Sequence, residues 1–289
     1  TSTIAEDTVF EGNETLNVTL TGATNATIAD GAGIGTIIDN DAAPTLAVSS
    51  PTVGEAGGHA LFTLTLSNPS SVATTVGLAL TDGSATGADF GPGLEVSTDG
   101  GSTWTSASSA TFAAGATSLL VRTPVVADAL DEIDETFTLT ATRTAGSTSN
   151  ASAFGTATIA DDDATPSLSV NDVTVNEAAG TMTFTVTLSA ASGQAVSVNY
   201  ATGDVTAAAG ADYSAGSGTL AFAPGVTSQT VTVTIAEDTV FEGDETFNVT
   251  LAAAVNATIA DNLGVGTIID NDGAPTLAVS SPTVAEGGG

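Results

Sequence analysis

The stretch TMTFTVTL, residues 181–188, decides the fold class because every second side chain is apolar. Met182, Phe184, Val186 and Leu188 alternate with four threonines. A period of two is typical of a β-strand with one buried and one wet face. Threonine and valine also favour strands over helices. The stretch therefore predicts a strand that covers one side of a core.

The same alternation recurs through residues 167–272 and predicts an all-β fold. Further strands are expected at 196–200, 220–222, 231–235, 247–251 and 268–269. Residues 168–175 are expected to form the first strand, with an irregularity at Asn171-Asp172. Gly, Asn, Asp and Pro separate these runs, and no stretch has a helical period. About seven short strands with such punctuation predict an antiparallel β-sandwich. In residues 45–163, the stretch 94–112 is expected to add a hairpin to the same scaffold.

Internal repeats predict the domain organisation. The sequence from Ile4 to Gly12 recurs word for word from Ile235 to Gly243. A more diverged copy lies between them. The predicted segments are the C-terminal half of a module at 1–41, a complete module with the hairpin insert at 45–163, a complete module at 167–272, and the start of a further module at 276–289. A fragment of a longer chain, a segment of a filament and strand exchange between neighbouring chains all fit this layout.

The composition narrows the function classes. The chain of 289 residues has 33 acidic residues, two arginines, no lysine and a formal net charge of −31. Such a surface repels nucleic acid and anionic membranes. No apolar run reaches the length needed to span a bilayer. The chain has no cysteine, so disulfides cannot stabilise it, and bound metal is the candidate that replaces them.

The acidic residues of 167–272 gather at predicted strand ends and loops. They are Glu177, Asp212, the group Glu237-Asp238 with Glu242, and the pair Asp270 and Asp272. Alternate loops of a sandwich meet at one end, so these carboxylates can converge there. Converging like charges resist ionisation unless a cation joins them. Calcium takes six to eight oxygen ligands, whereas the lack of cysteine and the single histidine argue against zinc or copper. A solvated acidic loop is the simpler alternative for any one of these residues.

Four features of the sequence point to a known family. They are Val175-Asn176-Glu177, the turn at 210–213, Asp238 to Glu245 followed by Thr246-Phe247, and the closing stretch 266–272. In these features the sequence resembles Calx-beta modules, which occur in the regulatory domains of sodium–calcium exchangers and in large bacterial surface proteins. The resemblance covers essentially the whole chain. It implies tandem immunoglobulin-like sandwiches in a rod, with calcium ions at one tip in those members that bind calcium.

The resemblance also implies calcium ligands by position. In 167–272 they are Glu177, Asp212, Asp238, Glu242, Asp270, Asp272 and the carbonyl of Val240, with Glu237 and Asn271 as secondary ligands. In 45–163 they are Glu55, Asp89, Asp128, Glu132, Asp161, Asp162 and Asp163. Residues 1–41 keep Asp7, Glu11, Asp39 and Asp41 but lack the first-strand glutamate, which Glu286 supplies for a module that is otherwise missing. Ala127 stands where the later module has Glu237, which predicts fewer ions or weaker binding in 45–163.

Three functions follow as hypotheses. The first is a structural segment of a bacterial extracellular adhesin or surface filament, in which calcium stiffens the joints between adjacent modules and chains can self-associate. The second is a binding module whose insert around Trp104 contacts a glycan or protein, although a packed hairpin residue is the better interpretation of that tryptophan. The third is a calcium-sensing regulatory module. We expect no enzyme, because the paired carboxylates recur in each module without the arginine or histidine partners of a sugar site.

Overall fold

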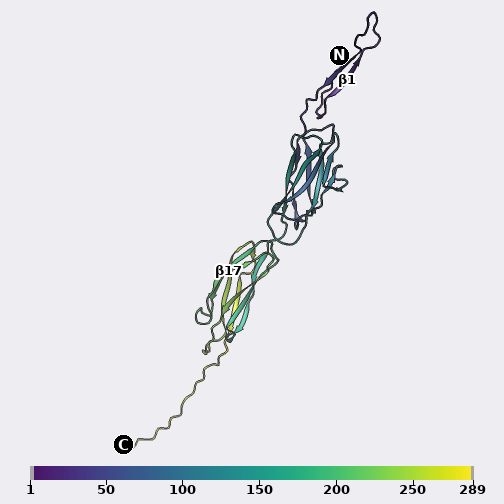
Figure 1. The fold of residues 1–289 in the computed structure, drawn as a ribbon. Helices are drawn as coiled ribbons and strands as arrows, with labels where there is room; N and C mark the ends of the chain where they lie inside the picture. The colour runs from purple at the N-terminus through teal and green to yellow at the C-terminus, as the bar shows by residue number, and fades with distance from the viewer. Residues whose placement is uncertain (1–2, 288–289) are drawn as a thin grey trace. The chain divides into compact units, whose positions relative to one another are not determined.

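The computed structural model describes residues 3–287, and the chain divides into two units by its contacts. The first unit comprises Thr1–Asp128 and Ile133–Asp162, and the second comprises Ala129–Glu132 and Asp163–Gly289. The outermost residues of the predicted first and last segments, 1–2 and 288–289, lie outside the described residues. The prediction of an all-β fold built from sandwiches is confirmed (Figure 1). In the described part of the chain, no helix has the length and apolar character needed to cross a membrane.

The first unit begins with a two-stranded hairpin. Strand β1 (Glu14–Thr19) pairs antiparallel with β2 (Ala32–Ile37), from Glu14 opposite Ile37 to Thr19 opposite Ala32. Its large apolar side chains are exposed, with Ile34 74% and Val18 53% accessible. A hairpin alone offers no second layer to bury these side chains.

The first sandwich has two five-stranded sheets, of order β3-β5-β10-β7-β8 and β4-β12-β11-β6-β9. Its strands are β3 Leu46–Val48, β4 Thr52–Gly54, β5 His59–Leu66, β6 Thr74–Asp82, β7 Glu95–Ser97, β8 Thr105–Ser106, β9 Ser109–Phe112, β10 Ser118–Pro124, β11 Glu135–Ala145 and β12 Ser152–Ala160. The 3-10 turn η1 (Glu55–Gly57) follows β4.

The second sandwich repeats this plan with sheets of order β18-β15-β13-β20 and β14-β21-β19-β16-β17. Its strands are β13 Ser167–Val170, β14 Val173–Asn176, β15 Thr181–Leu188, β16 Val196–Asp204, β17 Ser217–Phe222, β18 Ser228–Thr234, β19 Glu245–Val255, β20 Thr258–Ile259 and β21 Leu263–Ile269. The 3-10 turn η2 (Glu177–Ala179) follows β14.

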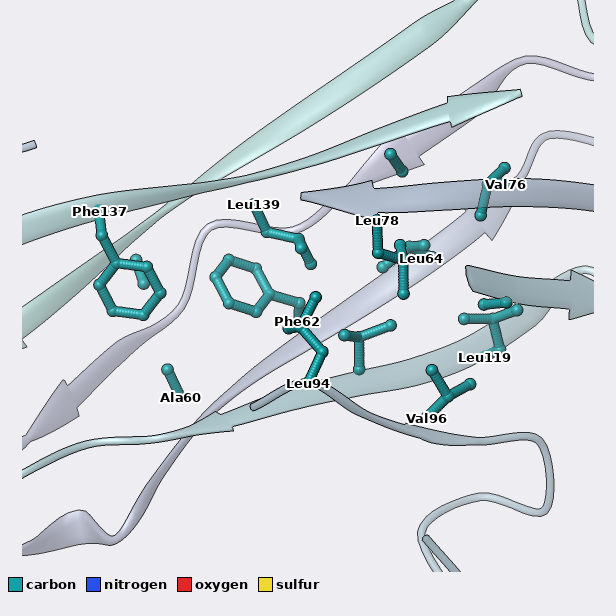
Figure 2. Close-up of a cluster of buried hydrophobic side chains, with 14 of the residues drawn as sticks. Ala60, Phe62, Leu64, Val76, Leu78, Leu94, Val96, Leu119, Phe137 and Leu139 are labelled. Carbon is teal, nitrogen blue, oxygen red and sulfur yellow. The ribbon is translucent and has the colours of Figure 1, made fainter. Parts of the chain in front are cut away.

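Alternating side chains fill each core as predicted. Figure 2 shows the first core, where Phe62, Leu64, Leu119 and Leu139 point between the two sheets. In the second core, Phe184 is fully buried and its ring meets the edge of a neighbouring aromatic ring. Burying one such side chain stabilises a fold by about 1.5–3 kcal/mol. These cores hold the strand ends, and therefore the acidic loops, in fixed register.

The first strand of each sandwich changes sheets halfway along. At Asn171-Asp172 the chain leaves the sheet of β15 and joins the sheet of β21. The two side chains replace the lost strand pairing, because Asn171 Oδ1 accepts the Thr185 N–H at 2.6 Å and Asp172 Oδ1 accepts the Val265 N–H at 2.7 Å. The expected irregularity at this place is confirmed. The second half of the strand then runs parallel to β21.

The insert in the first sandwich is shorter than the sequence predicted. Strands β7 and β8 form the added hairpin, with Glu95 opposite Ser106. Strand β9, which was expected to belong to the insert, pairs with β6. It occupies the place that β17 takes beside β16 in the second sandwich. The alternating pattern runs from the hairpin directly into the scaffold strand, so the boundary between them is not visible in the sequence.

Candidate metal centres

Parallel pairing brings two acidic residues together in the second sandwich. Strand β14 pairs with β21 so that Asn176 lies opposite Ile269. Glu177 and Asp270 are the next residues of the two strands and therefore leave the sheet side by side. Turn η2 begins at Glu177, and the Asn176 side chain accepts the Ala178 N–H at 3.0 Å. This bond fixes the direction in which the glutamate leaves the strand.

We define the first acidic group as Glu177, Asp270 and Asp272. Each offers a carboxylate oxygen, and these oxygens all lie within 4.8 Å of one another. Glu177 is buried, with 8% of its surface exposed. Burial raises its pKa, and nearby carboxylates, Asp238 foremost, add to this effect against a hydrogen bond from the Asp238 N–H. Among the described residues, Asp272 Oδ2 is a buried oxygen without a hydrogen-bond partner.

Asp270 anchors the loop that surrounds this group. Its Oδ2 accepts the N–H groups of Glu242 at 3.1 Å and Gly243 at 2.9 Å. Its Oδ1 accepts the Asp272 N–H at 2.9 Å. These backbone bonds, with that of Asp272 the strongest, lower the pKa of Asp270 despite its partial burial. Asp270 therefore stays ionised and joins β21 to the loop between β18 and β19.

We define the second acidic group as Asp212, Glu242 and Glu245, whose carboxylate oxygens also lie within 4.8 Å of one another. Asp212 comes from the loop between β16 and β17, and Glu245 begins β19. Burial raises the pKa of Glu245 to about 7, and its hydrogen bond to Asp212 adds to the shift. Burial also raises the pKa of Glu242, with help from the charge of Asp212. Protonation of Glu245 relieves charge repulsion in this group.

Glu245 was missing from the predicted ligands, as was Glu135, which stands at the same place in the first sandwich. Both residues are the first of a strand, so the alternating pattern places them in a sheet rather than in a ligand-bearing loop. The repeat itself carried the missing signal, because a glutamate recurs at this position in all three copies, as Glu14, Glu135 and Glu245.

The remaining predicted ligands of the second sandwich lie around the two groups. Asn271 Nδ2 donates to Glu237 Oε1 at 3.3 Å and to Asn176 Oδ1 at 3.1 Å. Asp238 Oδ1 accepts the Val240 N–H at 2.7 Å. The charges of Glu237 and Asp238 contribute to a raised pKa of Asp272, after burial and the charge of Asp270. That Glu237, Asp238, Val240 and Asn271 bind a cation stays a prediction.

The first sandwich brings the equivalent residues together in pairs. Carboxylate oxygens of Glu55 and Asp128 lie within 4.8 Å of each other, and so do those of Asp89 and Glu135. Parallel pairing of Gly54 with Ala160 explains why the glutamate emerges at the end of β12. Two other predicted ligands, Glu132 and Asp163, belong to the second unit by their contacts. Their membership of this site stays a prediction.

Two further predicted ligands follow β12 directly. Within the described residues, Asp161 Oδ1 is buried without a hydrogen-bond partner. The Asp161 N–H donates to Asp134 Oδ1 at 3.2 Å. Asp162 is exposed. It stands where the second sandwich has Asn271, and Ala127 stands where that sandwich has Glu237. Asp162 and Ala127 therefore cannot form the hydrogen bond that joins Asn271 to Glu237 in the second sandwich.

The N-terminal hairpin keeps the same local geometry. Asp39 Oδ2 accepts the Glu11 N–H at 2.9 Å, and Asp39 Oδ1 accepts the Asp41 N–H at 3.0 Å. Burial raises the pKa of Glu11, and the charges of Glu14 and Asp7 add to the shift. Glu286, by contrast, lies in an exposed stretch without strand structure. The two bonds that Asp39 accepts repeat those that Asp270 accepts from Glu242 and Asp272 in the second sandwich.

The donor chemistry of the acidic groups fits a hard cation. Every side-chain atom offered is a carboxylate oxygen, which suits calcium far better than a soft metal. Residues 163–289 contain neither lysine nor arginine. In the first sandwich, Arg143 lies eight residues from Glu135 along β11, roughly 25 Å at about 3.3 Å per residue, and Arg122 is paired with Glu95. A bound divalent cation would therefore supply the positive charge that these carboxylates lack.

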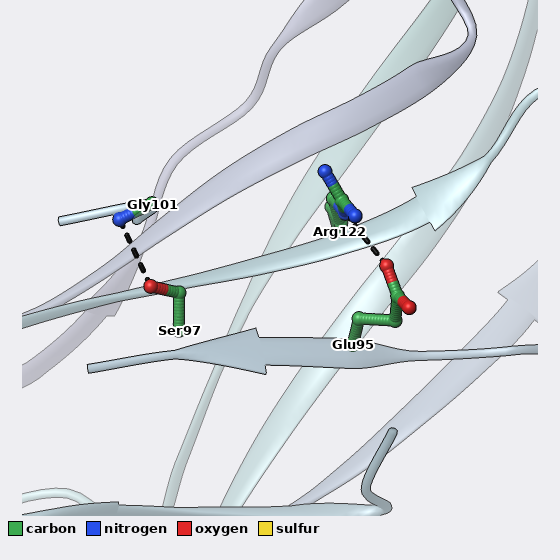
Figure 3. Close-up of polar contacts among 4 residues, drawn as sticks. All are labelled: Glu95, Ser97, Gly101 and Arg122. Carbon is green, nitrogen blue, oxygen red and sulfur yellow. Dashed lines mark hydrogen bonds and ion pairs between the residues drawn. The ribbon is translucent and has the colours of Figure 1, made fainter. Parts of the chain in front are cut away.

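The insert has polar contacts of its own. Arg122 on β10 donates through Nε to Glu95 Oε2 on β7 at 2.7 Å, and the Gly101 N–H donates to Ser97 Oγ at 2.9 Å (Figure 3). The Arg122 guanidinium also lies 4.1 Å from the centre of the Trp104 ring. One face of the tryptophan is thus covered by a cation of the same sandwich. This packing weakens the hypothesis that Trp104 binds a glycan.

Comparison with protein families gives one match. The model of the Calx-beta domain matches twice in tandem, at residues 39–163 and 160–272. No match was found among curated proteins.

Solved structures give further matches. The apo form of the Calx CBD1 domain is 29% identical, with a TM-score of 0.37, over 38% of this chain and 100% of that one. The two-domain CBD12 from CALX1.2 is 18% identical, with a TM-score of 0.34, over 78% of this chain and 99% of that one. A tetra-tandem repeat in the extending region of a large adhesion protein is 19% identical, with a TM-score of 0.38, over 89% of this chain and 55% of that one.

Proposed function

This chain belongs to the Calx-beta domain family, and from that premise we propose that it is a calcium-stiffened structural segment of a bacterial extracellular adhesin or surface filament. The proposed segments are a half-module at 1–41, complete modules at 45–163 and 167–272, and the start of another at 276–289. Calcium at the acidic groups orders the loops around them, and adjacent modules of the same chain are the primary partners.

One observation supports calcium binding most directly. The two acidic groups of the second sandwich gather six carboxylates, and residues 163–289 contain no lysine or arginine. Unpaired buried charges are strongly unfavourable. Asp272 Oδ2, which is buried and has no hydrogen-bond partner among the described residues, is the type of atom that a cation stabilises.

Stiffening follows from the position of the first acidic group. Asp272 directly precedes Gly273-Ala274-Pro275, the sequence that leads to the next predicted module. A cation held by Asp270 and Asp272 fixes the backbone where the linker begins. Because the ion binds the ordered loops and not the unfolded chain, it adds to their stability by linkage.

Calorimetric titration of the chain with calcium tests the proposal. We expect saturable binding of more than one ion per complete module, and no comparable binding of magnesium, which rarely uses all-protein cages. The double variant Asp270→Asn with Asp212→Asn removes one ligand from each group and should abolish binding by the second sandwich. Absence of calcium binding at millimolar concentration by the folded wild-type chain would overturn the proposal.

A further inference from the structure

We propose that Tyr213 is a positioning residue that holds the Asp212 loop in place for the cation, and that Phe90 leaves the equivalent loop of the first sandwich less well held. This inference rests on the proposed calcium-binding function. The Tyr213 hydroxyl contacts none of the acidic groups directly and acts through the loop between β16 and β17.

The Tyr213 side chain is buried and fixed on both sides. Only 2% of its surface is exposed, and its ring stacks on Phe247 with centres 4.2 Å apart and planes 13° apart. Its hydroxyl donates to Asp204 Oδ1 at 2.5 Å. The Tyr213 backbone also bridges to Ile235 on the neighbouring chain segment. The residue after Asp212 is thus fixed by both its ring and its hydroxyl.

The acceptor of that hydrogen bond ties in the start of the loop. Asp204 is the last residue of β16, and its Oδ1 also accepts the Ala209 N–H at 3.0 Å. One carboxylate oxygen therefore joins the strand end, the loop backbone and the tyrosine. Within the loop, Asp212 Oδ2 accepts the Ala208 N–H at 2.6 Å, and the Asp212 carbonyl accepts the Ala236 N–H at 2.8 Å. Asp212 is held in the direction of Glu242 and Glu245.

The first sandwich has the same stacked aromatic pair and the same aspartate, but Phe90 replaces the tyrosine and has no hydroxyl. Phe90 stacks on Phe137 with centres 4.1 Å apart and planes 14° apart, as Tyr213 does on its partner. Asp82 is the counterpart of Asp204, because each lies opposite the stacked phenylalanine in the strand register. A phenylalanine cannot donate to that aspartate. The geometry of the aromatic pair is therefore conserved within the chain while the hydrogen bond is not.

The loop of the first sandwich instead uses its own candidate ligand as the anchor. Asp89 Oδ2 accepts both the N–H of Thr86 at 2.7 Å and its hydroxyl at 3.2 Å. The second sandwich has Ala208 at this donor position and so has no competing hydroxyl. In Asp89, one of the two carboxylate oxygens thus already accepts two donors from its own loop. The tyrosine of the second sandwich holds its loop through Asp204, a residue outside the acidic group.

Exchanging the hydroxyl between the two sandwiches tests this inference. In the whole chain, Tyr213→Phe should lower calcium affinity at the Asp212 group about tenfold, the lower end of what lost outer-shell partners cost. Affinity at the group of Glu177, Asp270 and Asp272 should stay unchanged. Amide chemical shifts of Asp212 and Asp270 during a calcium titration report the two groups separately. Phe90→Tyr should raise affinity at Asp89.

The matched control is Tyr200→Phe, because Tyr200 is the chain's other tyrosine and lies on β16 away from the loop. It should leave both affinities unchanged. Phe90 shows that a phenylalanine fits the stacked position, and the gain expected from Phe90→Tyr does not depend on the fold of the other variant. Equal calcium affinities in wild type and Tyr213→Phe would overturn the inference while leaving the proposed function intact. A wild-type chain that binds no calcium would overturn both.

Discussion

The two sandwiches share one backbone plan but differ in the side chains around their acidic groups. In both, a parallel strand pair delivers a glutamate beside an aspartate, at Glu55 and Asp161 in one and at Glu177 and Asp270 in the other. The second sandwich adds Glu237, which accepts a hydrogen bond from Asn271. The first has alanine and aspartate at these two positions.

This difference shows that the position of the acidic groups and the strength of ion binding depend on different parts of the structure. Strand register determines where the carboxylates meet, because it depends on the core and on backbone pairing. The surrounding side chains determine how tightly an ion is held, since they set the charge and the freedom of each loop. We therefore expect both sandwiches to bind calcium, and the second to bind it more tightly.

Removing calcium gives the largest expected effect. A site saturated at 1,000 times its dissociation constant adds about 4 kcal/mol, and 1 kcal/mol moves the Tm of a domain of this size by about 4–8 °C. We expect a chelator to lower the Tm of the second sandwich by at least about 15 °C and that of the first sandwich by less. Differential scanning calorimetry with and without calcium measures both transitions.

Magnesium at the same concentration serves as the control, because it should restore little of the lost stability. A larger shift for the first sandwich would reverse the comparison. Identical melting curves in calcium and chelator would contradict calcium stabilisation altogether.

The sequence was sufficient to predict the fold and the place of the acidic loops. Alternation in strands such as 181–188 predicts which side chains are buried, and the structure agrees. The division of the acids into two groups could not be predicted, because it depends on separations of a few ångströms between loops. The role of Asp270 as a backbone anchor was equally hidden, since a carboxylate that accepts N–H groups has the same sequence signature as a metal ligand.

Replacing the anchor has the next largest effect. Asp270→Asn keeps the size of the side chain but removes the charge that strengthens three hydrogen bonds to backbone N–H groups. Hydrogen bonds to charged groups contribute about 1.5–3 kcal/mol. We expect the variant to lose about 2 kcal/mol of unfolding free energy in chelator and to lose calcium binding at the first acidic group.

Asp261→Asn is the matched control, because Asp261 is exposed and its carboxylate accepts a single N–H, from Leu263. It should change neither quantity by more than a few tenths of a kcal/mol. Asp161→Asn makes the same change in the first sandwich. If Asp161→Asn proved as damaging as Asp270→Asn, the two sandwiches would be anchored alike.

The pH dependence of the metal-free chain gives a smaller effect. The pKa of Glu245 is raised from 4.5 to about 7 by burial, by its hydrogen bond to Asp212 and by nearby charges. The folded state therefore holds more protons than the unfolded state between these two values. The unfolding free energy of the second sandwich should then fall as the pH rises from about 4.5 to about 7. Urea denaturation in chelator at several pH values measures this slope.

Glu245→Gln cannot titrate and should flatten that slope while raising stability at pH 7 in chelator. The lowered pKa of Asp270 acts in another window, because its contribution is lost only as the pH falls below about 3.8. A slope unchanged by Glu245→Gln would show that another group carries the titration.

The insert, which only the first sandwich has, gives the smallest expected effect. Trp104→Ala removes the contact between the indole ring and Arg122, a type of contact that contributes about 0.5–1 kcal/mol at exposed sites. We expect a loss of that size in the first sandwich, with calcium affinity and the second sandwich unaffected. Arg122→Gln keeps the tryptophan but removes both this contact and the ion pair with Glu95, so its stability loss should be at least as large. A glycan array probed with wild type and both variants distinguishes packing from recognition. Binding that is lost with Trp104→Ala and kept with Arg122→Gln would mean that the insert is an adhesive surface, and that the two sandwiches differ in function as well as in affinity.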